Sequence, residues 1–150
     1  MISIIIPAFN EEQSIINSNF IETLINVINE KNYENFEILV INDGSTDKTE
    51  ELLNKLKNKF NVLKILSNAL NQGYGSSLKL GIKNSKYDII VICDIDGTYP
   101  ADQVPIIIDK FIDSKKSKSK PIDMIVTQRT GKHYWESFIK TSLRFILKFI

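Results

Sequence analysis

The chain has 150 residues, a length that favours one domain able to bury about 70% of its unfolded surface. Its hydrophobic fraction of 43% and charged fraction of 25% are typical of a soluble globular protein. The net charge of +1 argues against a nucleic-acid partner, and no apolar run has the length and flanks of a signal peptide or membrane span. The single cysteine, Cys93, excludes an internal disulfide and fits a reducing, cytoplasmic compartment.

Charge is distributed unevenly along the chain. Residues 1–114 carry ten Lys and Arg against sixteen Asp and Glu, whereas residues 115–150 carry nine against two. Such an asymmetry predicts that the C-terminal end contacts something anionic.

Apolar runs rich in β-branched residues predict five buried strands, at 2–6, 36–41, 62–66, 89–93 and 122–127. Pro7 is expected to close the first of them. Helical spacing between the strands predicts a first helix with Ile16, Phe20, Leu24 and Val27 on its inner face, one beginning near Asp47, one with Leu78 and Ile82 inward, and one at 102–113. Strands alternating with helices predict a doubly wound α/β fold with a mostly parallel sheet.

Two carboxylates end the fourth apolar run. Asp94 and Asp96 are two positions apart, so in extended geometry both side chains point the same way. No basic residue lies within six positions on either side, and two such carboxylates repel unless a cation lies between them. Oxygen ligands suit Mg²⁺ or Mn²⁺, although a solvated loop after a strand is the plainer alternative.

Polar or small residues also follow the other predicted strands. In a parallel sheet these loops gather at one edge, where ligands bind. A metal-bound diphosphate needs such a set, because the cation bridges its oxygens, glycines permit close backbone approach and arginine pairs with phosphate. The residues are Asn10, Glu11, Asp43, Gly73, Gly75 and Arg129.

Four segments together carry a resemblance to a known family. They are residues 6–12 (IPAFNEE), 40–47 (VINDGSTD), 71–75 (NQGYG) and 94–100 (DIDGTYP). In this order and spacing they resemble the successive motifs of glycosyltransferase family 2, and most of all its dolichyl- or polyprenyl-phosphate sugar synthases. The resemblance implies the GT-A fold, with a Rossmann-like nucleotide-binding half.

The resemblance also implies roles for single residues. Asp94 and Asp96 would hold Mg²⁺ or Mn²⁺ on the diphosphate of a UDP- or GDP-sugar, and Arg129 would balance the charge of the departing nucleoside diphosphate. Asp43 would accept a hydrogen bond from the imide N–H of uracil or guanine. The nucleotide site would be lined by Pro7, Ala8, Asn10, Glu11, Gly73 and Gly75. The acceptor would be a polyprenyl phosphate or a glycan.

Residues 1–131 are expected to form the donor half of a glycosyltransferase domain, and residues 132–150 an amphipathic helix. Such domains usually continue well past residue 150, so we expect this chain to bind a nucleotide-sugar but to transfer little sugar alone. Residues 97–99 are Gly-Thr-Tyr where the synthases often have Leu-Gln-His, which leaves the sugar and the nucleotide open.

The last stretch, residues 134–150, has one broad apolar face and a basic strip of Lys140, Arg144 and Lys148. This pattern is typical of a helix that lies on an anionic membrane surface, which would make the protein peripheral on the cytoplasmic face. An ordinary core helix that lacks its cover is the equal alternative. An uncovered apolar face would associate with a membrane, another copy of the chain or a partner. The apolar face comprises Trp135, Phe138, Ile139, Leu143, Ile146 and Ile150.

Two other functions are compatible with parts of the sequence. Residues 91–98 (VICDIDGT) resemble the nucleophile motif of haloacid-dehalogenase-type phosphatases, in which Asp94 would attack phosphorus and Asp96 would act as acid and base. That motif normally opens its domain, and here three strand–helix units precede it. The second alternative is a protein that binds nucleotide-sugars without turnover.

Overall fold

The computed structural model describes residues 1–116 and 122–127. Its centre is a parallel sheet with the strand order β3-β2-β1-β4, which confirms the predicted α/β class. The strands are β1 (Ile2–Ala8), β2 (Phe36–Asn42), β3 (Leu63–Ser67) and β4 (Ile89–Ile92). β1 lies between β2 and β4 and is buried along almost its whole length.

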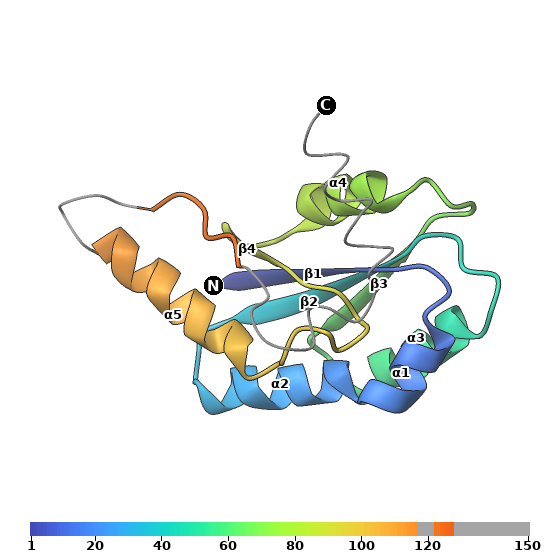
Figure 1. The fold of residues 1–150 in the computed structure, drawn as a ribbon, viewed down its shortest axis with the longest axis horizontal. Coiled ribbons are helices and arrows are strands. Elements are labelled where there is room, and N and C mark those ends of the chain that lie inside the picture. Colours follow the sequence, from blue (N-terminus) through green and yellow to red (C-terminus); the bar gives the residue numbers. More distant parts are fainter. Residues whose placement is uncertain (117–121, 128–150) are drawn as a thin grey trace, which may run out of the picture.

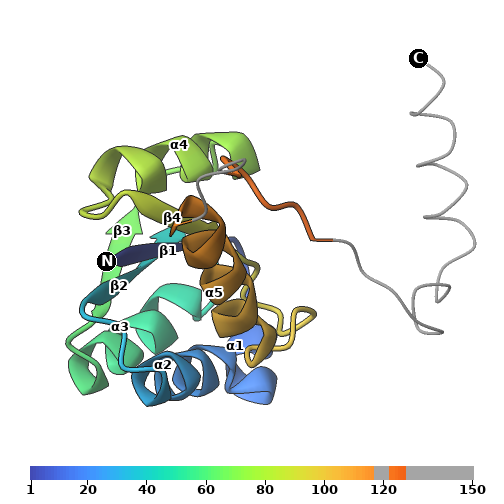
Figure 2. The ribbon, with the colours of Figure 1, turned by 90° about the vertical axis from the view of Figure 1, so that its left-hand side faces the viewer.

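Helices cover the two faces of the sheet unequally (Figure 1). On one face lie α1 (Glu12–Ser18), α2 (Phe20–Glu30), α3 (Thr49–Lys59) and α5 (Gln103–Lys116). α4 (Tyr74–Asn84) lies on the opposite face, where it packs mainly against β1 and β2 (Figure 2). None of the described helices is long and apolar enough to cross a membrane.

The main core lies between the sheet and the helices α2, α3 and α5. Alternate residues of the central strands enter it, because neighbouring side chains of a strand point to opposite faces. They meet the apolar face of α2, formed by Phe20, Ile21, Leu24, Ile25 and Ile28. On the other face Ile5, Leu39 and Ile41 form a smaller cluster with Leu78 and Leu80 of α4.

The first predicted helix is interrupted. Asn19 adopts a left-handed conformation with φ +46°, which asparagine tolerates better than most residues, and it separates α1 from α2. Ile16, expected on the inner face, is 53% exposed on α1. The expectation of one helix with Ile16 inward was wrong because the spacing of apolar residues does not report a change of helix axis.

Pro7 does not close the first strand, as expected from sequence, but lies within β1 opposite Ile41. The Ile5 carbonyl accepts a hydrogen bond from Cys93 N–H, so residues 5 and 7 direct their backbone groups toward β4. The pairing of β4 with β1 ends at Ile92, opposite Ile5. The missing N–H of Pro7 therefore costs no ladder hydrogen bond.

β4 is not buried on both faces, contrary to the sequence prediction. Ile89 and Val91 pack against the main core, but Ile90 and Ile92 are 36% and 44% exposed on the α4 side. The reason is that α4 covers β1 and β2 instead. Ile82 of α4, expected to point inward, is also 50% exposed.

Residues 122–127 do not form the expected fifth strand. A strand needs a hydrogen-bonded neighbour and a buried face, and this segment pairs with none of the described strands. Its side chains at Ile122, Met124 and Val126 are 43%, 74% and 78% exposed.

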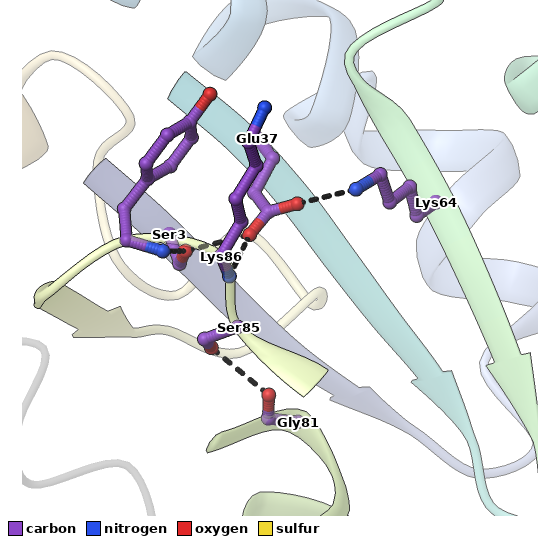
Figure 3. A network of polar contacts seen from close by, with 7 residues as sticks. Ser3, Glu37, Lys64, Gly81, Ser85 and Lys86 are labelled. Carbon is purple, nitrogen blue, oxygen red and sulfur yellow. Dashed lines mark hydrogen bonds and ion pairs between the residues drawn. The ribbon is translucent and has the colours of Figure 1, made fainter. Parts of the chain in front are cut away.

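A buried carboxylate ties the sheet to the turn between α4 and β4 (Figure 3). Glu37, 3% exposed, accepts hydrogen bonds from the Ser3 hydroxyl at 2.7 Å and from Lys86 N–H at 2.6 Å, and pairs with the Lys64 ammonium at 2.7 Å. Tyr87 N–H donates to the Ser3 hydroxyl at 3.1 Å. Burial alone raises the pKa of Glu37, but these hydrogen bonds and the lysine hold that pKa below its ordinary value.

We predict that Glu37→Ala lowers the free energy of unfolding by about 1–3 kcal/mol, because Lys86 N–H loses its acceptor. Lys64→Ala should cost less than about 1 kcal/mol, since the Lys64 side chain is 52% exposed. Urea unfolding of both variants measures this, and equal losses would contradict it. The folded pKa is depressed, so the contribution of Glu37 is present above its unfolded pKa of about 4.3 and is lost as pH falls through the folded value.

Candidate functional site

The four strand ends bring four loops to one edge of the sheet. β1, β2, β3 and β4 are parallel and end at Ala8, Asn42, Ser67 and Ile92. The loops that follow contain the four motifs singled out from sequence. Their hydrogen bonds link each loop to the next.

The first two loops are joined through Asn10. Its backbone N–H donates to the Ser45 hydroxyl at 3.0 Å, and its side-chain oxygen accepts Thr46 N–H at 2.8 Å. Asn10 has φ +55°, a left-handed conformation in which asparagine is favoured over most residues. The side chain of Asn10 therefore shapes the loop.

Asp47 and Thr49 hold the backbone of the same first loop. The Thr49 hydroxyl, in a fully buried residue, accepts Glu11 N–H at 2.8 Å. Asp47 accepts Glu12 N–H at 3.2 Å and Thr49 N–H at 2.9 Å, so one carboxylate satisfies N–H groups at the starts of both α1 and α3. Burial raises the pKa of Asp47, but its hydrogen bonds with Thr49 and Glu12 outweigh burial and hold the pKa below its ordinary value.

Asp43 joins the second loop to the third. Its carboxylate, 3% exposed, accepts hydrogen bonds from the Asn68 amide at 2.7 Å and from the N–H groups of Gln72 and Gly73 at 3.1 and 2.8 Å. Burial raises the pKa of Asp43, but these bonds outweigh it and hold the pKa below its ordinary value. The nearby Ser77 hydroxyl lowers the pKa of Asp43 further.

Gly44 is in close contact with the backbone of the third loop, whereas Gly73 and Gly75 lie beside open space. Gly44 has φ +68°, and a Cβ there would lie 2.5 Å from the Leu70 carbonyl carbon, so the third loop crosses directly over it. Gly73 also has a positive φ, of +88°, but a Cβ at Gly73 or Gly75 would meet nothing within 4 Å. The protein leaves open the space beside these two residues, as close approach of a ligand requires.

Asp94 and Asp96 follow β4 and point away from the core. Cys93 and Ile95 are buried at 5% and 2% exposed, whereas Asp94 is half-buried and Asp96 exposed. The chain turns at residues 95–96, so the extended geometry assumed from sequence does not hold there, and a shared side for the two carboxylates stays a prediction. Tyr74 at the start of α4 approaches Asp94 with its hydroxyl at 3.4 Å, which brings the fourth loop to the third.

Asp96 also shapes its own loop. One carboxylate oxygen accepts both the backbone N–H and the hydroxyl of Thr98, at 2.9 and 2.7 Å, around Gly97 with φ +71°. A hollow beside this turn is lined by Asp96, Tyr99, Pro100 and the α1–α2 junction at Ser18 and Phe20.

The residues present fit a cation that is completed by a ligand. Over residues 1–116 and 122–127, no group of three or more His, Cys, Asp or Glu side chains could hold a metal. Two carboxylates from one loop would supply part of an octahedron and leave the remaining positions to phosphate oxygens and water, which is how Mg²⁺ is usually bound.

The structure thus brings together most of the residues expected from sequence, while their contacts with a nucleotide stay predictions. Pro7 and Ala8 end β1 beside the site. Arg129 and the helix predicted from sequence for residues 132–150 lie outside the described residues. Sequence reasoning missed Asn68 and Thr49, which carry no signal except that polar residues after strands often hydrogen-bond neighbouring loops.

The sequence matches a known family and several proteins of known sequence. The model of the family described as Glycosyl transferase family 2 matches residues 3–146. A prophage bactoprenol glucosyl transferase homolog of Escherichia coli is 32% identical over 131 residues, which are 87% of this chain and 40% of the relative. A dolichyl-phosphate beta-glucosyltransferase of Trichomonas vaginalis is 24% identical over 97% of this chain and 45% of the relative. The chain thus spans less than half the length of these relatives.

Solved structures share the fold. Residues 1–349 of Staphylococcus aureus TarS, in complex with UDP-GlcNAc, are 26% identical with a TM-score of 0.59, over 85% of this chain and 37% of that one. A mannosyltransferase of Pyrobaculum calidifontis, 20% identical with the same TM-score over 79% of this chain and 33% of that one, shows the fold alone.

We predict that Asp43→Ala releases the third loop. Gln72 and Gly73 lose the acceptor of their N–H groups, so hydrogen exchange at these two amides should accelerate and the free energy of unfolding should fall by about 1–3 kcal/mol. Asp88→Ala, an exposed aspartate before β4, serves as the control and should leave both quantities unchanged. Because the folded pKa of Asp43 is depressed, wild-type protection should be present above the unfolded pKa of about 3.9 and disappear as pH falls through the folded value.

Proposed function

We propose that this chain, a member of glycosyl transferase family 2, is a glycosyltransferase that takes a sugar from a nucleotide-sugar donor. The donor is a UDP- or GDP-sugar, bound at the carboxyl edge of the sheet. The acceptor is a polyprenyl phosphate or a glycan. The single observation that carries the proposal is that one edge holds four hydrogen-bonded loops, with open space beside Gly73 and Gly75 and two outward carboxylates at Asp94 and Asp96.

The nucleotide would lie against the loops that Asp43 and Asn10 organise. A carboxylate has about four lone-pair sites, and the hydrogen bonds from Asn68, Gln72 and Gly73 use three. We assign the remaining site to the imide N–H of uracil or guanine. Pro7, Ala8 and Glu11 complete the lining. TarS, a structure of the same fold, is known in complex with UDP-GlcNAc and with UDP.

Asp94 and Asp96 would hold Mg²⁺ or Mn²⁺ on the diphosphate. When bound, the cation supplies positive charge where the departing nucleoside diphosphate gains negative charge. The chain itself contributes the two carboxylates in fixed loops and, we propose, the Arg129 guanidinium as a further cation for the phosphates. Preorganised charges of this kind stabilise a transition state without reorganisation during the reaction.

The polyprenyl-phosphate acceptor is inferred from the relatives. Two of them are described as a bactoprenol glucosyl transferase homolog and a dolichyl-phosphate beta-glucosyltransferase. A lipid phosphate is already ionised at neutral pH, so it can attack the anomeric carbon without a protein base. The phosphatase alternative is set aside, because the DIDGT motif follows three strand–helix units and lies within the family match.

We predict that UDP or GDP binds more tightly than ADP, because adenine has no imide N–H for Asp43. The difference should be about 1–3 kcal/mol, or roughly 5- to 150-fold in Kd, by calorimetry with Mn²⁺. Asp96→Asn should lower UDP or GDP affinity about tenfold with Mn²⁺ and leave it unchanged without Mn²⁺. Asp88→Asn makes the same charge change at the other end of β4 and should alter neither value. Equal affinity for all three nucleotides would refute the role of Asp43.

We predict transfer of labelled sugar to a polyprenyl phosphate under single-turnover conditions, with the chain in excess over UDP-glucose or GDP-mannose. The rate should fall well below about 1 per second for the 150 residues alone. Label in the lipid fraction, lost in Asp94→Asn, supports the proposal. Donor binding without transfer to any lipid phosphate or glycan would instead identify a nucleotide-sugar-binding protein without turnover.

A further inference from the structure

Two asparagine amides lie beside the Asp43 carboxylate, one at each of its oxygens. The Asn68 Nδ2 atom donates a hydrogen bond to Asp43 Oδ1 at 2.7 Å. Gly73 N–H is shared between Asp43 Oδ2 at 2.8 Å and Asn71 Oδ1 at 3.0 Å, so the Asn71 amide lies beside Oδ2. The carboxylate that we assign to the nucleotide base therefore has an amide neighbour on both sides.

These contacts decide which end of each amide remains available. A carboxylate only accepts hydrogen bonds, so Asn68 turns its NH₂ group toward Asp43 and keeps one N–H for another partner. A backbone N–H only donates, so Asn71 turns its oxygen toward Gly73 and keeps both hydrogens of its NH₂ group. Neither NH₂ group has a further acceptor within residues 1–116 and 122–127. Asn68 is half-buried and Asn71 exposed, so a ligand can reach both as donors.

The Asp43 carboxylate itself keeps one acceptor site. Each carboxylate oxygen has about two lone-pair sites. Oδ1 uses both, for the Asn68 amide and for Gln72 N–H at 3.1 Å, whereas Oδ2 accepts only Gly73 N–H. The Ser77 hydroxyl near this carboxylate is fully buried, so it offers a base no further acceptor. The edge thus presents one acceptor with an amide donor on either side.

We infer, on the basis of the nucleotide-sugar function proposed above, that this site selects uracil over guanine. Asp43 would be the acceptor, and the NH₂ groups of Asn68 and Asn71 would be the two donors. The hydrogen-bonding edge of uracil carries the complementary sequence, with an acceptor at O4, a donor at N3–H and an acceptor at O2. Thymine has the same edge, so a dTDP-sugar shares this chemistry with a UDP-sugar.

Guanine matches this arrangement less well. Its edge carries an acceptor at O6 followed by two donors, N1–H and the 2-amino group. Two adjacent donors need two acceptors, but both sites of Asp43 Oδ1 are already filled. The 2-amino group would therefore face an amide NH₂ group, and two opposed N–H donors leave each other without an acceptor, which costs affinity. Adenine and cytosine instead bring a ring acceptor to the carboxylate, so they are disfavoured as well.

Calorimetry with Mn²⁺ tests the inference on the 150-residue chain. UDP should bind about tenfold more tightly than GDP. Inosine diphosphate has the O6 and N1–H of guanine but lacks the 2-amino group, so it should bind several-fold more tightly than GDP. Because these two purines differ only in that group, the size of the base cannot explain such a difference. Comparison of UDP with dTDP, which lacks the ribose 2′-hydroxyl, then separates the two sources of the same edge.

A single substitution reverses one of the donors. Asn71→Asp replaces the NH₂ group with an acceptor and keeps the oxygen that Gly73 N–H uses. The ratio of the GDP Kd to the UDP Kd should fall from about ten toward one, because the 2-amino group of guanine gains an acceptor while uracil loses a donor. Asn26→Asp, the same change at an exposed position of α2, is the matched control and should leave the ratio unchanged. A general weakening of the fold would lower both affinities together, so the ratio reports on the donor itself.

Two results would overturn the selection of uracil while leaving the nucleotide-sugar function in place. One is GDP binding as tightly as UDP, with both tighter than ADP. The other is an unchanged ratio in an Asn71→Asp protein whose β1 and β2 amides still exchange slowly. Binding of none of these nucleotides, or equal binding of all including ADP, would instead refute the proposed base site and the selection of uracil with it.

Discussion

The parallel pairing of β1 with β2 on one side and β4 on the other positions every other part of the structure. Because the strands run the same way, their carboxyl ends meet at one edge, and the loops that carry Asn10, Asp43, Gly73 and Asp94 are brought together there. The near-continuous burial of β1 stabilises this arrangement. Apolar residues on both faces of one strand can be buried only between two layers of helices.

Hydrogen bonds from the loop backbone to buried or half-buried carboxylates hold these loops in position. Asp43 and Asp47 are held ionised by several N–H donors each, and each carboxylate joins two segments far apart in the sequence. Glu37 does the same at the opposite end of the strands, where it anchors the turn into β4. Buried carboxylates are stable only when donors compensate for lost hydration, so each of them specifies the position of the backbone that supplies those donors.

The two faces of the sheet differ in completeness. The face under α2, α3 and α5 has a closed core, whereas the α4 face is closed over β1 and β2 and open over β4. Asp94, at the end of β4 and near Tyr74 of α4, lies beside the open part of this face.

The sequence by itself determined the α/β class, the four strands of the sheet and the loops that carry the site, because buried strands and turn residues leave local patterns. It also placed Asp94 and Asp96 in the loop that follows β4. Only the tertiary structure decided that Pro7 lies inside β1, that Asn19 divides the first helix and that Ile90 and Ile92 are uncovered. Each of these depends on which neighbour a residue meets: Pro7 is tolerated because β4 ends early, and the isoleucines are exposed because α4 packs on β1 and β2. Local patterns record the preference of a residue for burial, but its actual neighbours are set by the packing of distant segments.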